Sequence, residues 1–155
     1  MPECDYEGCD EPALEDSDKC IYHKPNKNEE EAREFYKLIR QEAREPLGEK
    51  IEDKEGEEHR RWVFEDEVEW KGYQFPTIPS ESSEDQILFS FRNNKFVDRA
   101  VFMHATFEED ADFMHATFEG NASFGSATFE GFADFRSATF EGLADFMHAT
   151  FEEDA

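Results

Sequence analysis

Four residues near the N-terminus have the types and the spacing of a metal site. Cys4, Cys9, Cys20 and His23 form the pattern C-x4-C-x10-C-x2-H, which uses every cysteine in the chain. Three thiolates and one imidazole are a donor set that binds Zn²⁺ in tetrahedral geometry. Because the protein then fills all four positions, none is left for a catalytic water. We therefore expect a structural site with one zinc ion per chain.

The segment around these ligands favours the same interpretation. A piece of about 20 residues with few apolar side chains cannot order itself without a metal. The strings CDYEGC and ALEDSDKCIYH resemble small Cys3His zinc modules, and the likeness covers residues 4–23. The alternative is three free thiols and a surface histidine. Residues 1–24 hold eight acidic and two basic side chains, so we expect a docking or folding role rather than contact with DNA.

Composition restricts the partners of the chain. Its 155 residues include 40 acidic and 16 basic side chains, for a formal net charge of −24. This charge repels nucleic-acid phosphates and anionic lipids. The sequence has no apolar run long enough to span a membrane, and its acidic N-terminus lacks the apolar core of a signal peptide. We expect a cytoplasmic protein with no membrane or direct nucleic-acid contact and an unidentified, basic protein partner.

Phenylalanine recurs through the C-terminal half in alternating steps of five and six residues. The positions are Phe91, Phe96, Phe102, Phe107, Phe113, Phe118, Phe124, Phe129, Phe135, Phe140, Phe146 and Phe151, and from Phe102 onward each has alanine two residues earlier. Such steps rotate an α-helix by about 140° and 240°, which scatters the rings around it. In an extended segment, residues i−2 and i share one side. Each unit therefore reads as a short extended edge followed by a corner.

The period of eleven fixes how these edges close into a coil. Like edges must stack on like edges, so a coil has two or four edges, and two edges cannot enclose phenylalanine rings. Four edges give 22 residues per coil. The strings ADFMH, ATFEG, ASFGS and ADFRS resemble pentapeptide repeats, and the likeness covers residues 89–155. That resemblance implies a mainly β fold, a right-handed four-sided parallel β-helix, whose repeats serve as a stacking core without catalytic residues.

Adding 22 to a residue number identifies its neighbour in the next coil. The expected interior columns, with rings about 4.8 Å apart, are Phe102, Phe124 and Phe146; Phe107, Phe129 and Phe151; Phe113 and Phe135; and Phe118 and Phe140. On the outside, Glu108, Glu130 and Glu152 form one carboxylate ladder, and Glu119 and Glu141 form another. These ladders favour counter-ions or a basic partner; the alternative is a solvated surface that resists aggregation.

The same arithmetic argues against an active site. His104 and His115 have Ser126 and Ser137 in the next coil, and His148 lies two coils above His104, so the three histidines do not converge. Asp112 and Asp145 lie three residues before His115 and His148, but the repeats contain no nucleophile elbow, phosphate loop or pocket-forming insertion. We expect no enzyme, no catalytic residue and no cofactor other than the structural zinc.

The middle of the chain connects the two modules. Asn28 and Glu31 have the spacing of a capping box, which predicts an amphipathic helix over residues 29–44 that packs on the β-helix or docks a partner. Residues 49–60 are charge-rich and are expected to be mobile. Phe64, Trp70 and Phe75 repeat the six and five steps, which predicts a degenerate first coil interrupted by a loop around IPSESSED. The expected divisions are a zinc-binding module over 1–26, a helix and connector over 27–61, the degenerate coil and loop over 62–88, and the regular β-helix over 89–155.

The last coil suggests a further contact. The sequence stops at Ala155, the i−2 position of a unit whose phenylalanine would follow, so either the chain is truncated or another molecule covers its end. We expect an end-to-end homodimer through this coil.

The leading functional interpretation is a non-enzymatic interaction scaffold with a structural zinc site. The alternative, which the pentapeptide resemblance implies, is a DNA mimic that binds a type II topoisomerase and protects it from quinolones, although three regular coils rise only about 15 Å.

Overall fold

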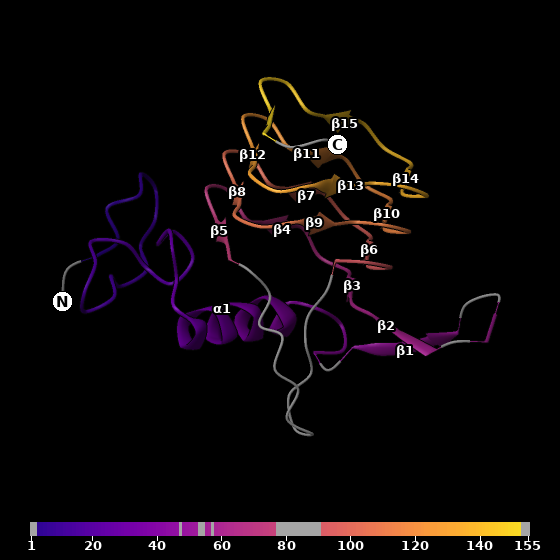
Figure 1. Cartoon of the computed structure of the whole chain (residues 1–155), viewed down its shortest axis with the longest axis horizontal. Helices are drawn as coiled ribbons and strands as arrows, with labels where there is room; N and C mark the ends of the chain where they lie inside the picture. Colours follow the sequence, from indigo (N-terminus) through magenta and orange to yellow (C-terminus); the bar gives the residue numbers. More distant parts are fainter. Residues whose placement is uncertain (1–2, 47, 53–54, 57, 77–90, 153–155) are drawn as a thin grey trace.

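The computed structural model describes residues 3–46, 48–52, 55–56, 58–76 and 91–152. It contains the helix α1 (Glu29–Gln41), the strands β1 (Glu49–Glu52) and β2 (Glu58–Arg61), and a series of two-residue strands that stack into coils (Figure 1). These strands are β3 (Val63–Phe64), β4 (Val68–Glu69), β5 (Gln74–Phe75), β6 (Lys95–Phe96), β7 (Ala100–Val101), β8 (Thr106–Phe107), β9 (Ala111–Asp112), β10 (Thr117–Phe118), β11 (Ala122–Ser123), β12 (Thr128–Phe129), β13 (Ala133–Asp134), β14 (Thr139–Phe140), β15 (Ala144–Asp145) and β16 (Thr150–Phe151).

The short strands form the four faces of a parallel β-helix. Three faces have the orders β3-β6-β10-β14, β4-β7-β11-β15 and β5-β8-β12-β16, and the fourth pairs β9 with β13. In the regular coils the partners are 22 residues apart, as in the pairing of Phe118 with Phe140. The prediction of a four-sided parallel β-helix is therefore confirmed.

A wider coil lies at the N-terminal end of this stack. Strands β3, β4 and β5 pair in parallel with β6, β7 and β8, and Phe64 lies opposite Phe96 at an offset of 32 residues. The offset exceeds the regular repeat by ten residues. The predicted loop around IPSESSED, which would hold these extra residues, lies outside the described ranges.

Phenylalanine rings fill the interior in continuous columns. The ring centroids of Phe102, Phe124 and Phe146 lie 4.7 and 4.8 Å apart, and the planes are parallel within 1°. The other predicted columns have spacings of 4.8 to 5.1 Å. Columns also extend into earlier units, where Phe75 stacks on Phe107 at 4.6 Å. The predicted columns and their spacing are confirmed, and the alanines between them are buried as far as Ala133.

Each five-residue step turns through a corner residue in the left-handed conformation. Asn93, His104, His115, Ser126, Ser137 and His148 have φ values between 56° and 67°. Asparagine and histidine tolerate this conformation better than most side chains. The histidine series therefore occupies repeated corners, where it has a backbone explanation. Gly72 holds the equivalent corner in the first coil, with φ +71°.

Helix α1 packs against the first coil. Its capping box is formed, since the Asn28 side chain accepts from the Glu31 amide and the Glu31 side chain accepts from the Asn28 amide. Phe35 contacts Phe75 edge-on at 5.3 Å, and the Tyr36 hydroxyl donates to the carbonyl of Pro76. The helix ends at Gln41 rather than at residue 44, because the chain turns away so that the Arg44 amide donates to the carbonyl of Val63 at 2.7 Å.

The prediction of a mobile segment over residues 49–60 was wrong. Strands β1 and β2 form an antiparallel pair in which Glu49 faces Arg61 and Ile51 faces His59. Gly56, with φ +82°, lies between them and supplies a conformation that turns require. The charged residues concealed the alternation, and cross-strand charge does not explain the register, because Glu49 faces Arg61 but Lys50 faces Arg60 and Glu52 faces Glu58.

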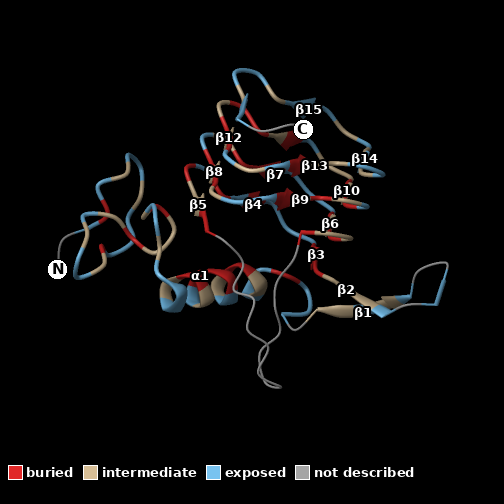
Figure 2. Cartoon of the chain, viewed as in Figure 1, coloured by how far each residue is buried: buried red, intermediate tan, exposed pale blue. Residues whose placement is uncertain are grey.

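The last coil is less covered than the others. Phe124 and Phe129 are fully buried, whereas Phe140 and Phe146 are partly buried and Phe151 is 38% exposed (Figure 2). Association through this end stays a prediction.

Within the described ranges, no helix has the length and apolar character that a membrane crossing requires.

The stacked core predicts a position-dependent cost of truncating phenylalanine. Phe124→Ala should lower the free energy of unfolding by about 3 to 5 kcal/mol, because it removes a ring that is stacked on both sides and leaves a cavity. Phe151→Ala removes the same atoms from a half-exposed ring and should cost less than half as much. Urea unfolding of the zinc-loaded chain measures both values. Equal losses at the two positions would contradict a core that is continuous along the axis.

Candidate metal centre

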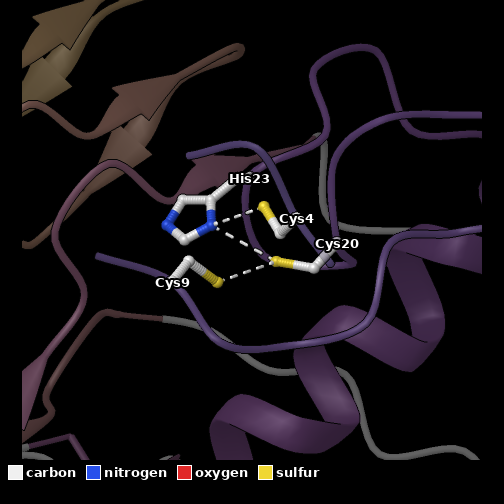
Figure 3. A group of neighbouring side chains, drawn as sticks. All are labelled: Cys4, Cys9, Cys20 and His23. Atoms are coloured by element: carbon white, nitrogen blue, oxygen red, sulfur yellow. Dashed lines mark hydrogen bonds between the residues drawn. The ribbon is translucent and has the colours of Figure 1, made fainter. Parts of the chain in front are cut away.

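The four predicted ligands converge in the N-terminal module. The Sγ atoms of Cys4 and Cys20 lie 3.5 and 3.2 Å from Nδ1 of His23, and the Sγ atoms of Cys9 and Cys20 are 3.8 Å apart (Figure 3). All four ligand atoms lie within 4.8 Å of one another. Cys4, Cys20 and His23 are buried, and Cys9 is half-buried. The residues that the sequence proposed as ligands thus form one cluster.

The dimensions of the cluster fit a tetrahedral zinc ion. Zn–S and Zn–N bonds of about 2.3 and 2.0 Å place neighbouring sulfurs about 3.8 Å apart and a sulfur and nitrogen about 3.5 Å apart. The observed separations of 3.2 to 3.8 Å agree with these edges. Soft thiolates with one imidazole also favour zinc over harder cations. Bound there, zinc would cross-link three separate parts of the module.

Local turns bring each pair of ligands together. The Cys9 amide donates to the carbonyl of Tyr6 at 3.0 Å, and Gly8 supplies φ +86° in that turn. The amides of His23 and Lys24 both donate to the carbonyl of Cys20, at 3.2 and 3.0 Å. This second turn has helical spacing, which explains why two intervening residues suffice between Cys20 and His23.

A backbone carbonyl outside the module orients the imidazole. Nε2 of His23 lies 3.1 Å from the carbonyl oxygen of Lys71, and a carbonyl can only accept, so Nε2 carries the proton. Nδ1 then carries the free lone pair, and this atom faces the thiols. Burial lowers the pKa of His23, which favours the neutral ring that a metal requires. Contacts of this kind orient ligands and strengthen zinc sites in general.

Burial opposes ionisation of all three thiols when no metal is bound. Burial raises the pKa of Cys20 to about 12 and also raises the pKa of Cys9. Burial acts in the same direction on Cys4, but hydrogen bonds with the backbone of Tyr6 and Cys20 and with the side chains of Cys20 and Cys9 together lower the pKa of that thiol. Zinc binding must therefore displace protons, so the affinity should rise with pH.

Aromatic stacking holds the module on the first coil. The Tyr6 ring lies parallel to the His23 ring at 4.0 Å, and a side chain at Gly72 would place its Cβ 2.2 Å from Cζ of Tyr6. Tyr22 stacks on Tyr73 at 4.7 Å. The Tyr22 carbonyl also accepts from the Gln74 amide at 2.8 Å. The metal cluster and β5 therefore share one interface.

Lys27 contributes to the same interface, and the sequence analysis did not identify this residue. Its Nζ donates to the carbonyls of Lys24 and Gln74, each at 2.7 Å, and lies 4.6 Å from the centre of the Phe35 ring. Burial lowers the pKa of this lysine to about 8. A lysine among acidic residues gives no local signal of such burial, because the contacts come from segments far apart in the sequence.

The carboxylate ladders are paired at one end. Glu108 is half-buried and accepts from the Asn26 amide at 3.3 Å, and Glu119 pairs with Lys95 at 3.0 Å. In the described part of the chain, Glu130, Glu141 and Glu152 have no ion-pair partner. Within the two ladders, the carboxylates without an ion-pair partner thus belong to the later coils.

Comparison with known proteins identifies the C-terminal repeats. Residues 113–155 match a family model described as pentapeptide repeats, in nine copies. Proteins with such repeats are generally structural or interaction proteins rather than enzymes. No curated protein and no solved structure matches the chain. The parallel β-helix thus contains a stretch, residues 113–155, that is similar to pentapeptide repeats, and a Cys3His cluster compatible with a metal precedes it.

The cluster predicts one tightly held zinc ion per chain. Cys20→Ser should abolish stoichiometric zinc, because it removes a buried thiolate that lies next to two other ligands. His104→Asn removes an exposed histidine from a corner that tolerates asparagine and should leave the zinc content unchanged. Elemental analysis of both purified variants measures the stoichiometry. Zinc retained by Cys20→Ser would refute the ligand assignment.

The docking contact predicts that a residue outside the module affects its metal. Gly72→Ala drives a Cβ into the Tyr6 ring and strains a left-handed corner. It should displace Tyr6 and the Lys71 carbonyl, and so weaken zinc about tenfold in competition with a chelator. Gly125→Ala is the matched control, since its Cβ would meet neighbours only at 3.7 Å or more. An unchanged zinc affinity in Gly72→Ala would contradict the prediction that contact with the first coil affects zinc binding.

Proposed function

We propose that the chain is a non-enzymatic interaction scaffold in which a structural zinc ion orders a small docking module on one end of an acidic β-helix. The observation that carries the proposal is the shared interface, in which His23 contacts Lys71 through Nε2 while Nδ1 faces the thiols. Metal binding is thereby coupled to the position of the module. The β-helix supplies a rigid support, since stacked rings fill its interior along the described coils.

The arrangement of charge favours a basic protein partner. Around the zinc ligands, the carboxylates of Glu3, Glu7, Asp10 and Glu11 are exposed. Three thiolates and a neutral imidazole around Zn²⁺ would add a further net negative charge to this surface. A partner with exposed lysine or arginine would be attracted, and nucleic acid would be repelled.

A second candidate is a mimic of DNA that acts on a type II topoisomerase. The unpaired column of Glu130 and Glu152, with Glu141 on another face, favours it, because regularly spaced carboxylates resemble backbone phosphates in charge. A supercoiling assay separates the two candidates. A mimic should inhibit the enzyme at stoichiometric concentrations and lose its effect as salt screens the charge.

Affinity capture from the host lysate tests which part of the molecule binds. Wild type is compared with Cys20→Ser and with Glu130→Gln/Glu152→Gln, and bound proteins are scored by mass spectrometry. We expect a partner that wild type and the glutamine variant retain and Cys20→Ser loses. A partner lost only by the glutamine variant would assign binding to the ladder and leave the zinc module as a folding cap. If wild type captures no protein beyond those captured by an unrelated acidic control protein, the proposal of an interaction scaffold is contradicted.

A further inference from the structure

A surface pocket of about 340 Å³ lies where the N-terminal module meets the first coil. Its walls include three tyrosines, Tyr6 and Tyr22 from the module and Tyr73 from the corner before β5. The metal ligands Cys9 and His23 also contribute to the wall. The pocket therefore exists only while the module is docked, and it borders the ligand cluster through Cys9 and His23.

Acidic side chains surround the tyrosines. Glu7, Asp10 and Glu11 from the module and Glu69 from β4 line the pocket, against one cation, Lys71. All four carboxylates are exposed, and none has an ion-pair partner within the part of the chain that the structure describes. Four unpaired carboxylates around a concave surface focus a negative potential there. A cationic group that entered would lose little, because it would exchange water for carboxylate oxygens.

The tyrosines give this pocket a chemistry that an acidic surface alone lacks. Tyr6, Tyr22 and Tyr73 are all half-buried, and their positions are fixed by stacking on His23 or on each other at 4.0 to 4.7 Å. Aromatic faces attract cations, and a guanidinium also stacks on them through its plane. Its donors match carboxylates in a two-point geometry, which an ammonium cannot do.

We propose that this pocket binds an arginine side chain from a basic segment of a partner protein. The guanidinium stacks on the tyrosine surface and donates to carboxylates of Glu11 and Glu69, which line the pocket from the module and from the coil respectively. The inference rests on the proposed function, because the module must be ordered to form one wall. It goes further by naming the chemistry that the docking surface recognises.

The test uses zinc-loaded full-length protein and the peptide Ac-Gly-Gly-Arg-Gly-Gly-NH2 in about 0.15 M salt, near physiological ionic strength. Binding is followed by amide shifts in ¹⁵N-labelled protein. We expect saturable shifts near Tyr6, Tyr22 and Tyr73, a weaker response to the lysine peptide, and none to the citrulline peptide. Citrulline keeps the shape of arginine and removes its charge, so equal shifts with citrulline would overturn the proposal.

Paired variants distinguish recognition from overall charge. Glu11→Gln/Glu69→Gln should weaken the arginine peptide at least about tenfold, at roughly fivefold for each lost charge contact. Glu130→Gln/Glu141→Gln makes the same change in net charge on the outer coils and should alter affinity less than twofold. Equal weakening by the two pairs would show that only net charge acts, and would overturn the site.

Zinc content measured on the same samples separates this inference from the proposed function. If zinc is stoichiometric and the arginine peptide does not bind, the pocket assignment is wrong and the zinc-ordered scaffold still stands. If the chain holds no zinc, the docking module itself is wrong. Calcium that shifts the same amides while the arginine peptide does not would assign the carboxylates to a metal, and would also overturn the proposal.

Discussion

The fold depends on one repeated contact, the parallel stacking of phenylalanine rings at the coil spacing. Each strand of the β-helix is only two residues long and contributes few backbone hydrogen bonds, so it cannot fix its own register. The ring does so instead. If one edge slipped by a residue, its phenylalanine would point outward and the columns would break. Rings of Phe102, Phe124 and Phe146 that stay parallel within 1° over three coils show how strongly this contact determines the backbone.

Because the interior rings determine the fold, the outward-facing residues can vary, except at the corners, where the backbone conformation limits the choice. The left-handed corner residues include asparagine, serine and histidine, which tolerate that conformation, so the exposed histidines require no metal to explain them. The first coil departs from this pattern in one useful way. Gly72 lacks a side chain at its corner, and the Tyr6 ring occupies the space. The corner that carries an outward side chain in later coils is therefore, at Gly72, the place where the N-terminal module contacts the first coil.

The columns could be predicted from sequence because one residue type at one period carries the whole signal. The Cys3His cluster could be predicted because chemistry limits which residues can hold a metal, whatever the local fold. The remaining features depend on contacts between distant segments. Lys27 reads as a surface lysine until Gln74 accepts from it, and the helix ends at Gln41 because Arg44 pairs with Val63. Strands β1 and β2 were missed because their charges conceal the alternation.

The placement of the module also has an energetic logic. An open solenoid end exposes strand edges and aromatic rings, which need a cover. Helix α1 supplies apolar cover through Phe35 and Tyr36, but the N-terminal module has too few apolar residues to pack on its own. A metal cross-link at the Cys3His cluster would remove that requirement, since it would order the chain without a core. The module can then keep an acidic surface while Tyr22 and Tyr73 hold it in place. The same few contacts that complete the end of the β-helix therefore set carboxylates from two segments around one cluster of tyrosines.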